Sequence, residues 1–194
     1  RADELGYRAL AITDRNTLAG IVRAHGAAKD LQFQLVIGAQ LDFEDALSVV
    51  VWVSDRATYA QLARLITVGR RQAEKGAFRL YWAQFAEHAQ DFWGAVMVPV
   101  GGDTATGVLN PYRDLWGPRC SLLADLHYGP DDRGRLEWYR DLARKSGIAV
   151  VASGDVHYHK ASRQPLHDVL TATRLGLTVD ELRHHRLVNA QRYL

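Results

Sequence analysis

The sequence predicts an α/β fold built around a parallel sheet. Six apolar segments of strand length alternate with segments of helix length, which is the order of βαβ units. Residues 148–152 form an unbroken apolar run, as expected of a parallel strand that is buried on both faces. The 194 residues suit a single domain with a sizeable core.

Strands are expected where short apolar runs are bounded by polar or turn-forming residues. These runs lie at residues 10–13, 35–41, 47–53, 95–100, 122–128 and 148–153. The first run ends in a polar Asp-Arg-Asn triplet that starts at Asp14, and the fourth is closed by Gly101 and Gly102. The predicted sheet therefore has six strands.

Helices are expected between these strands. Residues 56–71 give the clearest amphipathic pattern, with Leu62 and Ile66 on one face. Asn16 or Thr17 is expected to cap the helix that follows the first strand. The other expected segments are residues 81–89 (weakly helical), residues 104–119 (irregular or a short helix), a helix that starts at Asp131 or Asp132 and ends at Gly147, a helix that stops near Gly176, and a short helix started by the capping-box spacing of Thr178 and Glu181.

Composition excludes several classes of protein. The chain is 47% hydrophobic and 24% charged, and its net charge of +2 is too small to indicate nucleic-acid binding by itself. It contains no run of about 18 apolar residues, so no membrane span is expected. The single cysteine, Cys120, cannot form an internal disulfide, which fits a cytoplasmic protein. Residues 1–6 resemble the end of a helix capped by Gly6, so residue 1 is expected to be an internal position of a longer protein.

Side chains that could carry chemistry lie at strand ends. Asp155 and His157 follow the last strand, and Asp125 and His127 have the same Asp-x-His spacing at the end of the fifth. Side chains alternate along a strand, so each pair points to one side, away from the apolar face that packs on helices. The same alternation in the first two strands places Arg15 and Gln40 on this side as well. The residues expected at the mouth of the sheet are Arg15, Gln40, Asp125, His127, Asp155 and His157.

Two interpretations of this cluster remain open. Two aspartates and two histidines could hold zinc or manganese, and ligands spread over several strand ends are normal for barrel metalloenzymes. Arg15 cannot be a ligand because its guanidinium stays protonated, and a fixed cation opposes a metal ion. The second interpretation is a buried polar cluster whose charges are satisfied internally.

Four stretches together resemble a known family. They are ALAITDRNTLAGIVRAH, IGAQL, RATYAQLARLITVGRRQAEKG and VVASGDVHYH. They are similar to the N-terminal PHP domain (polymerase and histidinol phosphatase) of bacterial C-family DNA polymerases, above all that of the error-prone paralogue of the replicative alpha subunit. The resemblance makes residues 1–194 one PHP domain. It implies a distorted, TIM-like (β/α)7 barrel that lacks its first strand here, and a longer parent protein that synthesises DNA across damage.

The resemblance also implies which residues stand at the family's metal positions. An H-x-H motif on the first strand would precede residue 1, and the second motif, usually Asp-His, is Asp14 and Arg15 here. Asp155 and His157 alone match the last motif intact, as vestigial ligands. The other departures from the family pattern are Gln40 in place of a glutamate, Ser48 near the place of a histidine, and Gly101 and Gly102 in place of a ligand after the fourth strand.

These departures predict a scaffold domain of an error-prone polymerase that has no catalytic activity of its own. No cofactor is expected in this fragment; the alternative interpretation would add zinc or manganese, and the parent polymerase would need magnesium. The partners expected through that polymerase are DNA, the sliding clamp and translesion accessory proteins. The other functions weighed are a free-standing metal-dependent phosphoesterase of the PHP family and a barrel hydrolase of the amidohydrolase kind, which the error-prone signature disfavours.

Arg15 is the residue expected to replace the metal's charge. It should pair with Asp155 or Asp125, while His157 should be held by Asp125 or a backbone carbonyl. A barrel without its first strand exposes two apolar strand edges, on the first and last strands of this chain. The fragment is therefore expected to self-associate through those edges.

Overall fold

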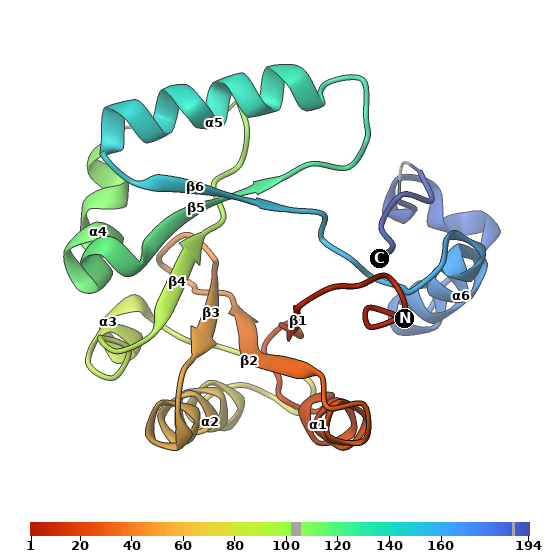
Figure 1. The fold of residues 1–194 in the computed structure, drawn as a ribbon, viewed down its shortest axis with the longest axis horizontal. Helices are drawn as coiled ribbons and strands as arrows, with labels where there is room; N and C mark the ends of the chain where they lie inside the picture. The colour runs from red at the N-terminus through yellow and green to blue at the C-terminus, as the bar shows by residue number, and fades with distance from the viewer. Residues whose placement is uncertain (102–105, 188) are drawn as a thin grey trace.

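Six strands form one sheet that curls into half a barrel in the computed structural model, which describes residues 1–101, 106–187 and 189–194 (Figure 1). The strands lie in the sheet in their order along the chain. Their bounds are β1 Ala9–Ile12, β2 Gln34–Leu41, β3 Val49–Val53, β4 Trp93–Val96, β5 Cys120–Asp125 and β6 Ala149–Ser153. The prediction of an α/β fold with these six strands is confirmed.

Helices cover the outer face of the curled sheet (Figure 1). Their bounds are α1 Ile21–Asp30, α2 Arg56–Arg71, α3 Trp82–Ala86, α4 Asn110–Trp116, α5 Asp132–Ser146 and α6 Gln164–Leu175. Short 3-10 segments are η1 Thr106–Leu109, η2 Gly117–Arg119, η3 Ala161–Arg163 and η4 Asp180–His185. Helices α1 to α5 lie outside the sheet, whereas α6 and the C-terminal segment lie beyond the gap between β1 and β6 (Figure 1).

The direction of β3 differs from the predicted parallel arrangement. It runs antiparallel to both β2 and β4, whereas the pairs β1–β2, β4–β5 and β5–β6 are parallel. Only residues 42–48 separate β2 from β3. A parallel pair needs a crossover connection of about a dozen residues or more, so this short link forces a hairpin.

Helix ends follow the predicted capping residues with one exception. Gly147 and Gly176 are the C-caps of α5 and α6, with left-handed φ angles of 71° and 68°. Helix α2 has its predicted bounds and begins with a capping box, in which the Asp55 carboxylate accepts a hydrogen bond from the Thr58 amide at 2.8 Å. Helix α1 begins later than predicted, after Gly20, because the chain turns through a left-handed residue at Asn16.

Apolar residues pack on both faces of the sheet, but the residues of β6 are exposed or half-buried, so the expectation that the last strand is buried on both faces is wrong. The larger cluster, between the sheet and the helices, includes Leu122 and Ala124 of β5. The smaller cluster lies on the opposite face and includes Leu123. Asp125 shares the parity of Leu123, so it ends β5 on the face away from the helices, as the alternation of side chains predicts.

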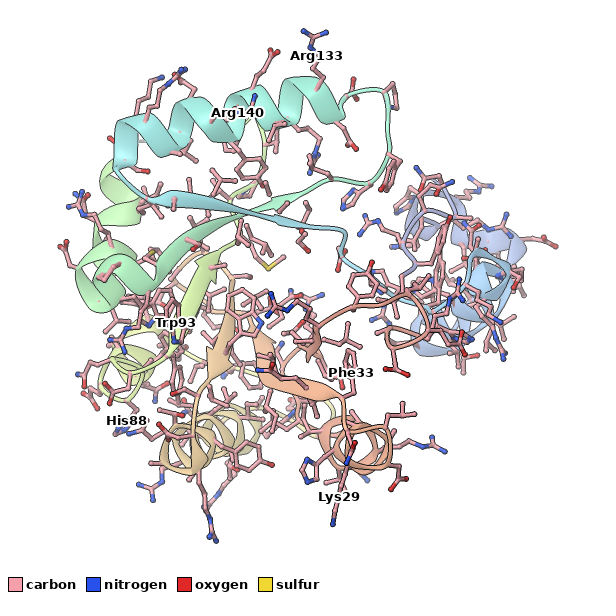
Figure 2. The ribbon with its side chains drawn as sticks, viewed as in Figure 1. Lys29, Phe33, His88, Trp93, Arg133 and Arg140 are labelled. Carbon is pink, nitrogen blue, oxygen red and sulfur yellow. The ribbon has the colours of Figure 1, made fainter. Side chains whose placement is uncertain are left out.

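Charged side chains stand on the outer faces of α1 and α5 (Figure 2). Arg133 and Arg140 of α5 and Lys29 of α1 point away from the sheet (Figure 2). Within the described ranges, none of the helices has the length and hydrophobicity needed to cross a membrane.

Gly94 of β4 allows the Trp116 ring to pack directly on the sheet. A Cβ atom at this position would lie 2.2 Å from a ring carbon of Trp116, which is itself buried to 1% exposure. The indole nitrogen of Trp116 donates to the carbonyl of Ala89 at 2.9 Å, so the ring cannot easily shift. Close packing at this contact therefore requires glycine.

We expect Gly94→Ala to lower the free energy of unfolding by about 1–3 kcal/mol, the usual cost of overpacking a core. Gly134→Ala is the matched control, because nothing lies within 4 Å of a Cβ on this residue of α5. Alanine there should leave stability unchanged or raise it by about 0.5–1 kcal/mol. Urea unfolding of both variants measures the difference, and equal stability of Gly94→Ala and the wild type would contradict this account.

Candidate functional site

Polar side chains gather where the strands end on the concave face of the sheet. A cleft of about 520 Å³ opens there, with Ser48 on one side and Asp125, Arg135 and Tyr139 on the other. Apart from Asp125, the residues predicted at the mouth divide into two hydrogen-bonded groups at the strand ends. One group surrounds Asp42, and the other surrounds Arg192.

Asp42 joins the ends of the first three strands. Its carboxylate accepts hydrogen bonds from Arg15 Nε at 2.5 Å, Asn16 Nδ2 at 2.8 Å and Ser48 Oγ at 2.8 Å. Gln40 Nε2 lies at 3.4 Å from the same carboxylate. Burial alone would raise the pKa of Asp42, but the hydrogen bonds from Arg15, Ser48 and Asn16 outweigh it and lower the pKa. Asp42 is therefore held as a carboxylate.

The predicted pairing of Arg15 with Asp155 or Asp125 is wrong. Arg15 pairs with Asp42, and its side chain is 66% exposed. Backbone bridging between Arg15 and Gln40 brings the end of β1 beside the β2–β3 hairpin, so Asp42 is the acid within reach. Asp42 stands two positions after Gln40, and strand parity could have placed both side chains on one side.

Two other positions singled out in the sequence lie outside these hydrogen bonds. The Asp14 side chain turns toward Gly20, where a Cβ would lie 2.5 Å from a carboxylate oxygen of Asp14. Gly101 has a positive φ of 82°. Gly102, also expected to replace a ligand, lies outside the described residues.

Arg192 lies between the ends of β5 and β6. One guanidinium nitrogen contacts Asp155 Oδ2, and the other lies 3.1 Å from His127 Nδ1. His157 Nε2 lies 3.3 Å from the same Asp155 oxygen, so its partner is Asp155 and not the predicted Asp125 or backbone carbonyl. The hydrogen bond from His157, together with the charge of Arg192, lowers the pKa of Asp155 to about 2 in spite of burial. Nothing in the sequence around Arg192 indicated this role.

Asp125 and His127 each bury an atom for which the described residues provide no hydrogen-bond partner, Oδ1 and Nε2 respectively. Burial, then the charge of Asp155, raises the pKa of Asp125. Burial, then the charge of Arg192, lowers the pKa of His127. Both residues therefore favour their neutral forms more than they would in water.

The donor set does not suit a metal ion. Across the described part of the chain, no three His, Cys, Asp or Glu side chains lie close enough to share one. Arg192 already engages Asp155 Oδ2 and His127 Nδ1. A second guanidinium, from Arg135, donates to the carbonyl of Asp125 through two nitrogens at 3.2 Å. Two fixed cations beside two carboxylates leave little negative charge to attract a metal.

The chain is similar in sequence to a known family and to several longer proteins. A family model described as PHP domain matches residues 1–116. The chain is 42% identical over 194 residues to the error-prone DNA polymerase of Methylococcus capsulatus, and 37% identical over 205 residues to that of Rhodopirellula baltica. In each case the alignment covers 100% of this chain and 18% of the relative. The chain thus spans less than a fifth of the length of these two relatives.

Two solved structures resemble the fold. A protein described as a metal-dependent phosphoesterase, from Bifidobacterium adolescentis, has a TM-score of 0.55 at 13% identity, covering 79% of each chain. An amidohydrolase from Chromobacterium violaceum has a TM-score of 0.54 at 14% identity, covering 81% of this chain and 80% of its own. At such low identity these likenesses show the fold alone.

We expect Asp42→Asn to lower the free energy of unfolding by about 2–3 kcal/mol at neutral pH, because it removes charge-assisted hydrogen bonds from three residues. Glu44→Gln is the control, since the described contacts of Glu44 involve its backbone amide and not its carboxylate. The folded-state pKa of Asp42 is lowered, so its contribution is present above the unfolded pKa of about 4 and is lost as the pH falls through the folded value.

Urea unfolding of wild type, Asp42→Asn and Glu44→Gln at a series of pH values measures this dependence. The gap between wild type and Asp42→Asn should narrow below about pH 4. A gap that stays constant down to strongly acid pH, or that Glu44→Gln reproduces, would show that the Asp42 carboxylate does not stabilise the strand ends.

Proposed function

The chain belongs to the PHP domain family, and on this premise we propose that it is a structural domain of an error-prone DNA polymerase without phosphoesterase activity of its own. The alignments support the polymerase context, because relatives named error-prone DNA polymerase match the chain over its whole length and are much longer. A fold by itself does not determine an activity, so the catalytic part of the proposal rests on the mouth of the sheet.

The observation that carries the proposal is the convergence of substituted residues on Asp42. Arg15 and Gln40 stand where the family resemblance places a histidine and a glutamate, and Ser48 stands near the place of a second histidine. In this structure all three direct their side-chain donors to the Asp42 carboxylate. A catalytic zinc normally needs three protein ligands and one open position. Here the substituted residues donate to Asp42, and arginine, glutamine and serine at these positions offer no such set.

The proposed role places the domain in translesion DNA synthesis through the parent polymerase, in the bacterial cytoplasm. DNA would be bound by the whole polymerase, with the sliding clamp and translesion accessory proteins as partners. Magnesium would belong to the polymerase centre and not to residues 1–194. The names of the curated relatives support this context.

The competing function is a metal-dependent phosphoesterase that uses zinc or manganese at Asp155 and His157. We expect residues 1–194 to show no manganese- or zinc-stimulated hydrolysis of a model phosphodiester or phosphomonoester, and no primer extension, because too few ligands are free. The assay compares wild type, His157→Ala and His25→Ala, the last an exposed histidine on α1. The phosphoesterase function would be established instead if manganese stimulated hydrolysis by the wild type, and if His157→Ala abolished this hydrolysis while His25→Ala retained it.

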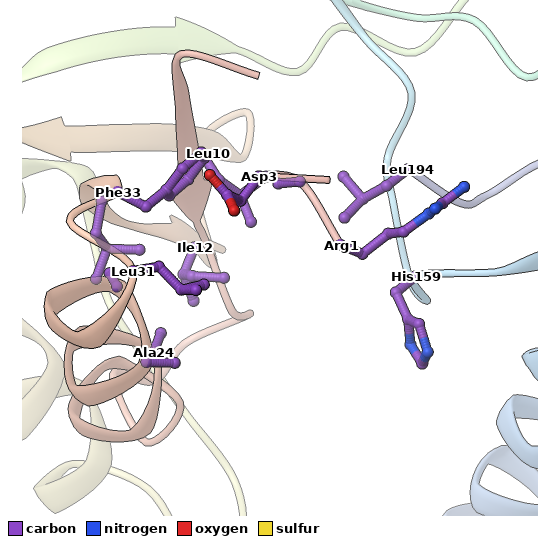
Figure 3. A pocket seen from close by; sticks show the side chains of 13 residues that line it. Arg1, Asp3, Leu10, Ile12, Ala24, Leu31, Phe33, His159 and Leu194 are labelled. Atoms are coloured by element: carbon purple, nitrogen blue, oxygen red, sulfur yellow. The ribbon is translucent and has the colours of Figure 1, made fainter. Parts of the chain in front are cut away.

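We also propose that residues 1–194 self-associate through the outer edges of β1 and β6. In the described sheet, β1 pairs only with β2 and β6 only with β5, so each has a free edge. An apolar pocket of about 280 Å³ lies beside β1, lined by Leu10, Ile12, Leu31 and Phe33 among others (Figure 3). Free apolar strand edges are templates for pairing with another chain.

Light scattering of residues 1–194 should therefore report a mass that rises with concentration. Ala11→Lys should reduce this association, because a lysine on an edge strand opposes pairing. Val22→Lys is the control, since Val22 is 79% exposed on α1, away from both strand edges. A monomer at every concentration, or an equal effect of both lysines, would contradict association through the β1 edge.

A further inference from the structure

Residues 189–193 lie across the ends of β5 and β6. The amide of Asn189 donates from Nδ2 to the carbonyl of His127 at 2.8 Å. The backbone amides of His157 and Tyr158 donate to the carbonyl of Arg192 at 2.9 Å and 3.2 Å. Tyr158 and Tyr193 form an isolated parallel bridge. The backbone of this segment is therefore tied to the chain that follows each of the two strands.

The same segment carries the Arg192 side chain into the mouth. That side chain is 14% exposed, whereas the other guanidinium paired with an acid at this mouth, that of Arg15, is 66% exposed. Arginine can only donate hydrogen bonds, so His127 Nδ1 must accept and the ring must carry its proton on Nε2. Asp155 and His127 are thus bound to one cation.

Carboxylates that converge at strand ends repel one another, so a neighbouring cation stabilises their charged forms. Asp125 and Asp155 come from neighbouring strand ends, close enough for the charge of Asp155 to raise the pKa of Asp125. Arg135 reaches the backbone carbonyl of Asp125, and Arg192 reaches the carboxylate of Asp155. Arg135 belongs to helix α5, whereas Arg192 comes from a segment outside the sheet and its covering helices.

We propose that Arg192 is the fixed cation for Asp155, supplying the positive charge that a metal ion would otherwise provide there and latching residues 189–193 onto the ends of β5 and β6. This role of Arg192 rests on the proposed function, in which the domain has no metal centre, and it names the group that neutralises Asp155. It also assigns a function to Asp155 and His127: they are the docking site for the C-terminal segment of this domain.

Hydrogen–deuterium exchange on the full-length polymerase tests the latch. Arg192→Gln should speed exchange of the amides of His157 and Tyr158 by about tenfold or more, because the charge that holds their acceptor in place is lost. Arg192→Lys should give an intermediate rate, since lysine keeps the charge but not the planar fork. Arg186→Gln is the matched control: Arg186 also pairs with an acid near the C-terminus, Asp168 at 3.7 Å, but does not contact the mouth.

Asp155→Asn provides a second variant should Arg192→Gln fail to fold, and it should release the same amides. Addition of zinc chloride should leave exchange of the wild type unchanged. Unaltered exchange of these amides in both Arg192→Gln and Asp155→Asn would overturn the latch. It would also be overturned if the wild type retained zinc through dialysis and residues 189–193 then lost their protection from exchange. If the wild type hydrolysed a model phosphoester while residues 189–193 stayed protected from exchange, the proposed function would be overturned and the latch would stand.

Discussion

Carboxylates gathered at the ends of strands must be given cations or hydrogen-bond donors, and the arrangement of this mouth depends on that requirement. Asp42 is satisfied by groups from the ends of β1 and β2 and from the β2–β3 hairpin. Asp155 is satisfied by Arg192 and His157. Both acids sit where parallel strands of the sheet end, so each ion pair also fastens a connecting segment to the mouth.

The antiparallel strand β3 has a direct consequence for this chemistry. Its short hairpin brings Ser48 back beside Asp42, and the backbone bridge from Arg15 to Gln40 brings β1 to the same place. A longer crossover at residues 42–48 would have made β3 parallel to β2 and placed Ser48 at the opposite end of the strands. The hairpin thus lets Arg15, Gln40 and Ser48 donate to one carboxylate.

Similar folds can hold very different sites, and this chain illustrates why function has to be argued from side chains. The resemblance to structures described as a metal-dependent phosphoesterase and an amidohydrolase extends over about four-fifths of the chain. In this chain, guanidinium nitrogens of Arg15 and Arg192 contact the acids at the strand ends. A permanently charged donor cannot serve as a metal ligand, so the identity of these side chains, and not the fold, limits the chemistry that is possible here.

Features that depend on near neighbours along the chain could be predicted from the sequence. Periodicity and local backbone preference account for the strand segments, the bounds of α2, the glycine caps at Gly147 and Gly176, and the side on which Asp125 lies. The direction of β3 and the partners of the charged residues became clear from the three-dimensional structure alone. Arg15 and Asp42 are 27 positions apart, and Arg192 and Asp155 are 37 apart. Such pairs depend on loop length and strand register, which no local pattern encodes.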